Sequence, residues 1–291
     1  MIVAKFGGST LTNAKDFKNI PGILHHRPEI KFIVVSACKG ITDQLIKLSS
    51  CSSLEKENCF SRIMGFHKNI INSLFLDSNE LSNYINKIEI EMKELISSNF
   101  SLMQMDQLLS IGERLSSAIL TSYLQSCGFN ISCLDARKLI ITDDNFGRAH
   151  PIMHKIKEVC RSSIFSQNYD GIFITQGFIG STEDGITTTL GREGSDYSAA
   201  ILAVALDADE LEIYKDVAGV YTHDPKIEPG AQLIEKLNYS EMFKISNKGS
   251  NVLHFPAIKL CQHYNIPMNI KSIFNPYLKG TLINNHERKA S

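Results

Sequence analysis

The segment TTTLGREGSDYSAAILAVAL, residues 187–206, decides the fold of this chain. Its three β-branched threonines favour a strand, its two glycines favour a turn, and the small and apolar side chains after Tyr197 predict a buried helix. We expect Ser195 or Asp196 to cap that helix. A strand that turns through glycines into a helix start presents free backbone N–H groups, which together with the helix dipole favour an anion.

Two opposite charges flank this helix start. Arg192 lies in the turn, where a guanidinium can hold a carboxylate or phosphate through two parallel hydrogen bonds. Asp196 follows four residues later and could hold an ammonium group. This pair suits an α-amino acid. On the turn alone, an ordinary strand-to-helix connection with a surface arginine and a capping aspartate is slightly favoured; the rest of the chain reverses that preference.

Composition indicates a globular protein without a nucleic-acid or membrane surface. The 291 residues are 43% hydrophobic and 21% charged, with a net charge of −1. No apolar run reaches membrane-spanning length, and the N-terminus lacks a signal pattern. The seven cysteines contain no Cys-x-x-Cys pair and the nine histidines show no metal spacing. We therefore expect a cytoplasmic protein without a disulfide framework or protein-bound metal cluster.

Polar, glycine-containing loops follow several predicted strands. Strands at 2–6, 31–35 and 171–175 each run into such a loop. In a parallel sheet these loops share the carboxyl edge, where ligands bind. Lys5 would lie at this edge, where an ammonium group can neutralise phosphoryl oxygens. The alternative is a set of tight strand-to-helix connections.

The remaining pattern alternates strands with helices and contains no linker or internal repeat. Repeated strand, loop and helix units predict an α/β fold with a mainly parallel sheet between helical layers. We predict helices at 15–27, 151–165, 239–246 and 255–264, a mainly helical region at 54–126, strands at 130–134, 138–141, 210–214, 267–270 and 281–283, and a hairpin turn at 182–186.

One helical segment carries polar residues of interest. Glu113 and Arg114 interrupt an otherwise apolar helix, and Gly112 costs about 1 kcal/mol of helix propensity. A glycine beside a buried carboxylate suggests a ligand passing close to the helix. The alternative is a surface pair between Glu113 and Arg114, which the flanking apolar residues disfavour.

Several motifs occur together in a fixed order. They are Lys5-Phe-Gly-Gly-Ser9, Ser36-Ala-Cys-Lys-Gly-Ile-Thr42, Gly112-Glu113, Gln176-Gly-Phe-Ile-Gly180, Thr188-Thr-Leu-Gly-Arg192, Gly194-Ser-Asp-Tyr197, Lys215-Asp-Val-Ala-Gly-Val-Tyr-Thr-His-Asp-Pro225 and Val252-Leu-His254. No G-x-x-x-x-G-K-[ST] or G-x-G-x-x-G motif is present. The ordered set resembles the catalytic domain of aspartokinases, members of the amino acid kinase family, from residue 2 to about 283.

The resemblance implies fold, reaction and partners. The expected fold is a three-layer αβα sandwich with a mainly parallel sheet of about eight strands. The expected reaction is ATP-dependent phosphorylation of the L-aspartate β-carboxylate, with Mg²⁺, as the first step toward lysine, threonine, methionine and diaminopimelate. We expect a homodimer. The catalytic domain would span 1–283 with a helical excursion at 54–126, and the tail at 284–291 would carry no ACT regulatory domain.

The resemblance also assigns site residues. Lys5 would neutralise the transferring phosphoryl group, Arg192 would bind the substrate α-carboxylate, and Asp196 would complete the catalytic set and orient Lys5. Glu113 and Asp196 would face the substrate ammonium group. The substrate-binding set is Ser36, Thr42, Glu113, Arg192, Ser195 and Asp196, and the ATP-binding set is Lys5, Gly7, Gly8, Ser9, Lys215, Asp216, Tyr221, Lys226, Asn251 and Val252.

The chain departs from the family pattern at three points. Glu193 replaces a usual glycine, and we expect its side chain to point to solvent. Asn251 replaces a usual lysine, for which we expect Lys248 or Lys215 to compensate. The sequence also stops before the usual ACT domains, so we expect no feedback through them.

Two other functions stay open on the sequence. The chain could act on a different carboxylate, carbamate or phosphate within the same superfamily, or it could be a catalytically weakened nucleotide-binding relative. Retention of Lys5, Arg192 and Asp196 argues against the second.

Overall fold

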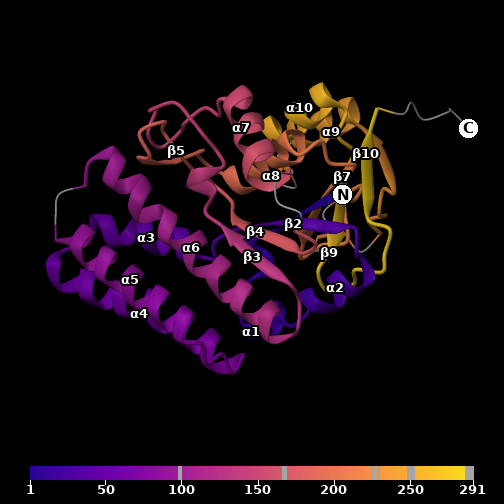
Figure 1. Cartoon of the computed structure of the whole chain (residues 1–291). Helices are drawn as coiled ribbons and strands as arrows, with labels where there is room; N and C mark the ends of the chain where they lie inside the picture. The colour runs from indigo at the N-terminus through magenta and orange to yellow at the C-terminus, as the bar shows by residue number, and fades with distance from the viewer. Residues whose placement is uncertain (98–99, 166–168, 224–226, 229, 248–252, 286–291) are drawn as a thin grey trace, which may run out of the picture.

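The protein is a three-layer αβα sandwich, as predicted (Figure 1). The computed structural model describes residues 1–97, 100–165, 169–223, 227–228, 230–247 and 253–285. Its central sheet has eight strands in the order β3-β4-β2-β1-β7-β9-β10-β8, and β10 is antiparallel to β9. The strands are β1 (Ile2–Phe6), β2 (Ile30–Val35), β3 (Ile131–Leu134), β4 (Ile172–Gln176), β7 (Glu210–Lys215), β8 (Lys236–Asn238), β9 (Met268–Ser272) and β10 (Thr281–Asn284).

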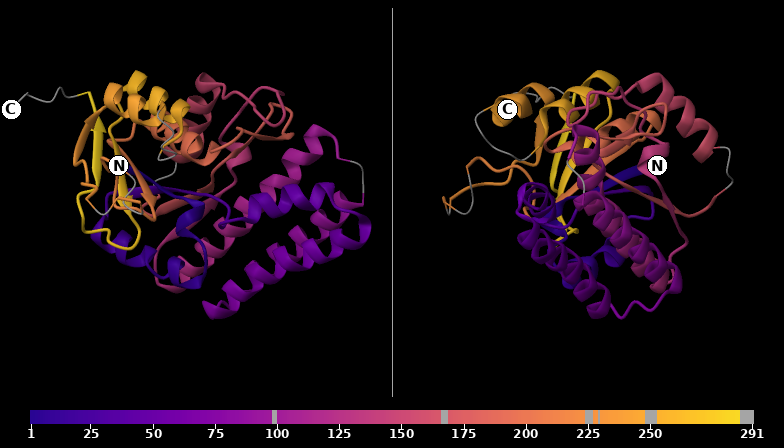
Figure 2. Two further views of the ribbon diagram at one scale, coloured as in Figure 1. Left: turned by 180° about the vertical axis from the view of Figure 1, so that it is seen from behind. Right: turned by 90° about the vertical axis from the view of Figure 1, so that its left-hand side faces the viewer.

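Helices cover both faces of the sheet. One layer contains α1 (Ala14–Phe17), α2 (Ile20–His26), α3 (Ile41–Ser50), α4 (Ser53–Ser73), α5 (Asn79–Ile96) and α6 (Leu102–Ser126). The other contains α7 (Met153–Cys160), α8 (Gly194–Ala205), α9 (Tyr239–Asn247) and α10 (Phe255–Tyr264). Helices α4 and α5 pack against α3 and α6 and extend away from the sheet (Figure 2). No helix in the described ranges is long and apolar enough to cross a membrane.

Strand β1 shows why the central strands are continuously apolar. Ile2, Ala4 and Phe6 join the core on the α1–α6 side, whereas Val3 joins the core on the α7–α10 side. Both faces of a central parallel strand are covered, so both need apolar side chains. Lys5 is the exception on this strand, and its ammonium group contacts helix α8.

The threonine strand predicted at 187–189 is present, but it lies outside the main sheet. It forms β6 (Thr187–Thr189), which pairs antiparallel with β5 (Ile179–Ser181). The intervening residues 182–186 make the predicted hairpin turn. This hairpin, called the β5–β6 hairpin below, leads directly into α8.

Two predicted elements were wrong in detail. The helix predicted at 15–27 is split into α1 and α2, because Pro21 in the first turn of α2 cannot continue a preceding helix. The predicted strand at 138–141 does not form a ladder: a 3₁₀ turn covers 136–138, and Ile141 makes only an isolated bridge to Ser181. Asp135 caps that turn by accepting a hydrogen bond from the Arg137 backbone N–H.

Candidate active site

A cavity of about 730 Å³ opens at the carboxyl edge of the sheet, a volume in the range of small-molecule sites. The loops after β1 and β2 form one wall, helix α6 forms another, and the turn before α8 forms a third. The predicted site residues that line it together are Gly8, Ser9, Ser36, Thr42, Glu113, Arg192 and Ser195. Segments far apart in the sequence therefore converge on one cavity.

Beside this cavity, two lysines share one buried carboxylate. Lys5 Nζ lies 2.6 Å from Asp196 Oδ1, and Lys215 Nζ lies 3.3 Å from Asp196 Oδ2. Burial alone would raise the pKa of Asp196, but the charges of Lys215 and Lys5 hold it well below its ordinary value. Burial lowers the pKa of Lys5, and the pair with Asp196 opposes that shift. Asp196 is therefore ionised and fixes both ammonium groups.

The cluster adjoins the glycine loop after β1. A Cβ atom added to Gly7 would lie 3.2 Å from Lys5 Nζ, and one added to Gly8 would lie 2.9 Å from the Ala37 carbonyl oxygen. Side chains larger than hydrogen would therefore crowd the ammonium group and the neighbouring loop. The two glycines therefore allow this loop to pack closely against Lys5 and against the loop after β2.

Glu113 projects from α6 into the cavity wall and is 3% exposed. Burial raises its pKa to about 8, although a hydrogen bond from the Ala37 backbone N–H lowers it in part. Its Oε2 atom has no hydrogen-bond partner among the described residues. A buried carboxylate in a cavity wall, with an oxygen that has no partner, is suited to a cationic ligand group.

The neighbours of Glu113 bear on two sequence-based questions. Arg114 makes a bidentate ion pair with Glu91 of α5, and both N–O distances are 2.7 Å. The alternative of a surface pair between Glu113 and Arg114 is therefore excluded. The prediction that a ligand passes close to the helix at Gly112 and Glu113 stays a prediction, but the glycine itself has another explanation. A Cβ atom at Gly112 would lie 2.8 Å from Ala37 Cβ, so the chain itself makes the close approach.

The turn before α8 differs from the prediction at its cap. The N-cap residue is Glu193, with φ of 58°, and no side chain caps the helix. Ser195 and Asp196 lie in the first turn, and the Asp196 carboxylate binds lysines instead. Glu193 and Arg192 are both exposed at the cavity rim. A left-handed backbone explains why the related pattern has glycine at the Glu193 position.

The nucleotide-binding predictions fall into separate groups. Gly8 and Ser9 line the cavity, whereas Asp216 and Tyr221 do not belong to its described lining. Asp216 is exposed directly after β7, and Tyr221 is half-buried and bridged to Leu233. The predictions for Lys226, Lys248, Asn251 and Val252 lie outside the described residues.

Sequence reasoning missed Asp106, which also lines the cavity. It is 1% exposed and accepts three hydrogen bonds from Gly147 and Thr189. Burial raises its pKa, although hydrogen bonds from Thr189 and Gly147 oppose the shift. Its position seven residues before Glu113 places both carboxylates on one helix face, and that spacing was the available signal.

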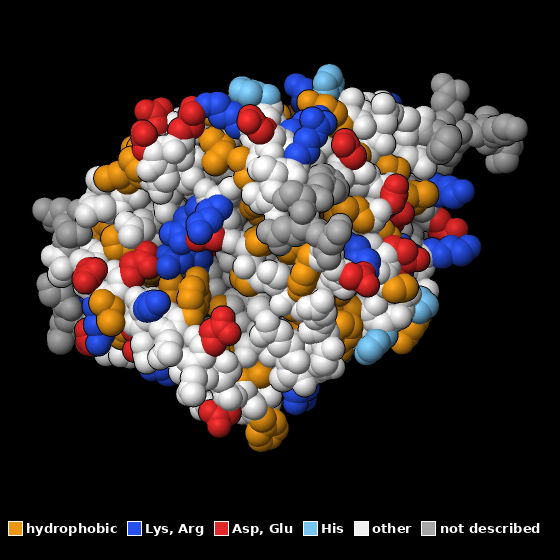
Figure 3. Space-filling model, viewed as in Figure 1, with side chains coloured by type: hydrophobic (Ala, Val, Ile, Leu, Met, Phe, Trp, Pro, Cys, Tyr) orange, Lys and Arg blue, Asp and Glu red, His pale blue; other side chains and the backbone are white. Residues whose placement is uncertain are grey.

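The surface around these elements has mixed charge. On the face in Figure 3, acidic and basic side chains are interspersed and apolar ones occur in small groups. This distribution agrees with the net charge of −1.

Comparison with known proteins identifies relatives along almost the whole chain. The chain is 34% identical over 288 residues to an aspartokinase of Chlamydia pneumoniae, covering 97% of this chain and 62% of the relative. It is 32% identical to lysine-sensitive aspartokinase 3 of Escherichia coli, covering 98% and 64%. The crystal structure of E. coli aspartokinase III in complex with aspartate and ADP superposes with a TM-score of 0.94 at 31% identity, covering 99% and 65%.

The chain thus spans less than two thirds of the length of these relatives. The model of the amino acid kinase family matches residues 1–272, which include the residues that line the cavity and every strand of the central sheet except β10. This chain belongs to the amino acid kinase family.

Proposed function

We propose that this protein is an aspartate kinase, which transfers the γ-phosphoryl group of ATP to the β-carboxylate of L-aspartate and yields 4-phospho-L-aspartate and ADP. The observation that carries the proposal is that Arg192 and Glu113, whose Oε2 atom has no partner among the described residues, line one cavity beside the Lys5–Asp196–Lys215 cluster. The likeness to an aspartokinase solved with aspartate and ADP supports it.

The two charged ends of the amino acid find different partners. The exposed Arg192 guanidinium would bind the α-carboxylate through paired hydrogen bonds. Glu113 would accept from the α-ammonium group, because its Oε2 atom is available. Asp196 is less suited to this role, since each of its oxygens lies against a lysine. Ser36, in the loop after β2, and Thr42, in the first turn of α3, would contact the β-carboxylate.

The chemical step needs no base from the protein. A β-carboxylate oxygen forms a bond to the γ-phosphorus while the bond from that phosphorus to the β,γ-bridging oxygen breaks and ADP leaves. The carboxylate is already ionised at neutral pH, so alignment and charge neutralisation supply the catalysis. Lys5 and Lys215, fixed by Asp196, would stabilise the charge on the transferring oxygens.

The nucleotide phosphates would lie over Gly7, Gly8 and Ser9, where a side chain at either glycine would crowd its neighbours. Mg²⁺ bound to the nucleotide phosphates would offset part of their negative charge. Such an ion would be held mainly by phosphate oxygens and water. We also propose a homodimer that serves the first step of aspartate-family amino acid synthesis.

A panel of acceptors tests the proposal. ADP release would be measured with ATP and Mg²⁺ plus aspartate, glutamate, acetylglutamate or UMP. We expect aspartate alone to give a rapid, saturable rate. A higher kcat/KM for another acceptor would assign the chain to a different reaction of its family, and ATP binding without transfer to any acceptor would reject an enzymatic role.

A further inference from the structure

Asp106 of α6 ties together two segments that border the active-site cavity. Its Oδ2 atom accepts hydrogen bonds from the backbone N–H groups of Gly147, at 2.8 Å, and Thr189, at 2.9 Å. Its Oδ1 atom accepts from the Thr189 hydroxyl at 2.7 Å. Hydrogen bonds to an ionised acceptor are stronger than neutral ones, so this buried carboxylate is a firm anchor.

The two segments held by Asp106 also contact each other. The Ala149 backbone N–H donates to the Thr189 carbonyl oxygen at 2.8 Å. A Cβ atom added to Gly191 would lie 3.5 Å from the Gly147 carbonyl oxygen. The loop around Gly147 is therefore the surface on which the turn of Gly191 and Arg192 rests. Fixing that loop and Thr189 fixes the base from which Arg192 extends.

Helix α6 thus presents two buried carboxylates to one cavity, and their partners differ. Glu113 retains an oxygen without a hydrogen-bond partner among the described residues, as a ligand-binding group would. Both oxygens of Asp106 accept hydrogen bonds from the protein. Asp106 therefore has little remaining capacity to accept hydrogen bonds from a substrate, whereas Glu113 can still accept one through Oε2.

We propose that Asp106 is a positioning residue that holds the Arg192 turn in the geometry needed to bind the substrate α-carboxylate. This inference rests on the proposed function, which assigns Arg192 to that carboxylate. Asp106 acts through Thr189 and Gly147 and does not itself touch the substrate. Its removal therefore weakens binding of the amino acid and leaves binding of the nucleotide unchanged.

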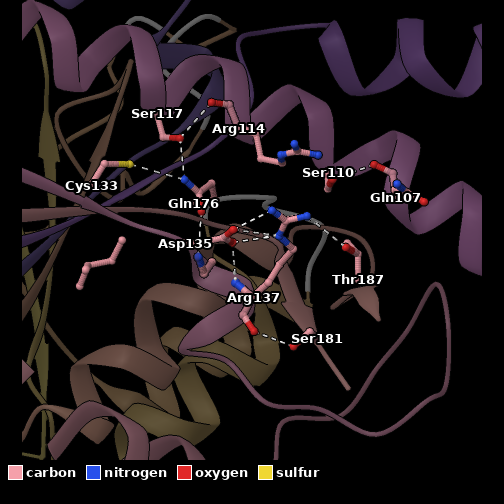
Figure 4. Close-up of polar contacts among 12 residues, drawn as sticks. Gln107, Ser110, Arg114, Ser117, Cys133, Asp135, Arg137, Gln176, Ser181 and Thr187 are labelled. Carbon is pink, nitrogen blue, oxygen red and sulfur yellow. Dashed lines mark hydrogen bonds and ion pairs between the residues drawn. The ribbon is translucent and has the colours of Figure 1, made fainter. Parts of the chain in front are cut away.

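The far end of the same strand provides an internal comparison. Thr187, two residues before Thr189 on β6, accepts a hydrogen bond from Arg137 Nη1 at 3.4 Å (Figure 4). The Ser181 hydroxyl of β5 donates to the Arg137 carbonyl oxygen at 2.6 Å (Figure 4). These contacts hold the β5–β6 hairpin at the end remote from Arg192. Thr187 and Thr189 therefore allow the same substitution at a control position and at the test position.

The first test compares Asp106→Ala with Asp106→Asn in the full chain. The alanine variant should raise the KM for aspartate about tenfold or more, equivalent to the loss of one aligned charged contact, while the KM for ATP changes less than about twofold. Asparagine should restore most of the affinity. Its carbonyl oxygen can accept both N–H groups, and its amide can donate to the Thr189 hydroxyl.

The second test compares Thr189→Val with Thr187→Val. Loss of the Thr189 hydroxyl removes one of the three contacts to Asp106 and should raise the KM for aspartate by roughly fivefold, as expected for about 1 kcal/mol. The Thr187 variant should leave this KM unchanged. Equal effects of the two substitutions would show that general loosening of the β5–β6 hairpin, and not the Asp106 anchor, controls substrate affinity.

A readout without catalysis separates this inference from the proposed function. Amide hydrogen exchange of segments 143–150 and 187–193 should accelerate in Asp106→Ala and return toward wild type in Asp106→Asn. If wild-type protein does not phosphorylate aspartate, the proposed function fails and the exchange data alone decide whether Asp106 holds the turn. Unchanged exchange and unchanged KM in Asp106→Ala would overturn the inference, as would equal impairment by alanine and asparagine.

Discussion

Among single residues, Glu113 gives the most specific prediction about how the substrate binds. Its pKa is raised to about 8 by burial, so the free protein carries it mainly protonated at pH 7. An ammonium group beside the unpartnered oxygen favours the ionised form. Aspartate binding at pH 7 should therefore release roughly one proton. Titration calorimetry in buffers of different ionisation enthalpy measures that number, and Glu113→Gln should abolish it.

The same group sets a pH dependence of substrate affinity. Only the ionised fraction of Glu113 is competent for the ammonium group, so the apparent Kd for aspartate should fall about tenfold between pH 7 and pH 9. An affinity that is flat across this interval in the wild type would remove Glu113 from the ammonium site.

Glu113 also predicts a pH dependence of stability. In the unfolded chain its carboxyl loses the proton near its ordinary pKa of 4.5, whereas in the folded chain it keeps the proton to about pH 8. The folded state thus binds more protons across this window, and the free energy of unfolding falls as pH rises. Melting temperatures at pH 5 and pH 8 should show a larger drop for wild type than for Glu113→Gln; parallel drops would contradict the raised pKa.

At the scale of elements, the packing of α6 against the loop after β2 holds the cavity wall together. Gly112 permits the contact with Ala37, whose N–H group donates to Glu113, and the Ser116 hydroxyl donates to the Ser36 carbonyl oxygen at 2.6 Å. The substrate-facing loop is therefore positioned by a helix, through one close approach and two hydrogen bonds.

A pair of glycine substitutions tests this contact. Gly112→Ala places a Cβ 2.8 Å from Ala37 Cβ, and overpacking of this kind costs about 1–3 kcal/mol, more than alanine gains in helix propensity. Urea unfolding should show a less stable protein with weaker aspartate binding. Gly65→Ala in α4 meets nothing within 4 Å and should stabilise the protein by about 1 kcal/mol. Stabilisation by both substitutions would show that α6 and the loop are not in tight contact.

At the scale of the whole molecule, a buried ion pair joins the α1–α6 layer to the middle of the sheet. Glu212 of β7 is completely buried, and Arg27 at the end of α2 lies 2.8 Å from it through Nη2. The Tyr214 hydroxyl donates to the same carboxylate at 2.7 Å. Removing Arg27 would leave the buried, negatively charged Glu212 without its nearest cationic partner, which is strongly unfavourable.

Arg27→Ala should therefore lower the free energy of unfolding by about 3 kcal/mol. Lys68→Ala, which breaks the more exposed pair with Glu89, should cost less than about 1 kcal/mol. Chemical denaturation of both variants checks the contrast. A loss below 1 kcal/mol for Arg27→Ala would show that Lys271, 3.7 Å from Glu212, compensates for the missing partner.

Much of this architecture was predictable from local sequence. The apolar runs of β1, β2 and β4 and the glycine-rich loops after them indicated a parallel sheet with a ligand edge. Strand β8, with the sequence Lys-Leu-Asn, offered no periodic signal. The 3₁₀ turn after Asp135 could not be foreseen either, because a side chain of β4, Gln176, accepts the Ala136 backbone N–H and so helps to fix it.

The sequence predicted which residues form the site better than it predicted the contacts among them. The motifs placed Lys5, Glu113 and Arg192 at one edge, but the sharing of Asp196 between two lysines joins residues that are far apart in the sequence. The spacing of Asp106 from Glu113 could have marked it as a candidate, but its hydrogen-bond partners, 41 and 83 residues away, could not be foreseen. Long-range hydrogen bonds leave no local pattern in a single sequence.

Trapping of aspartyl phosphate by hydroxylamine tests the central claim most directly, because the hydroxamate forms only if the β-carboxylate has received the phosphoryl group. With ATP, Mg²⁺ and aspartate, wild-type protein should give aspartyl hydroxamate. Lys5→Met should give at least about a hundredfold less, as expected for loss of a cation that stabilises the transferring group. Absence of hydroxamate from the wild type, or an undiminished yield from Lys5→Met, would contradict the account.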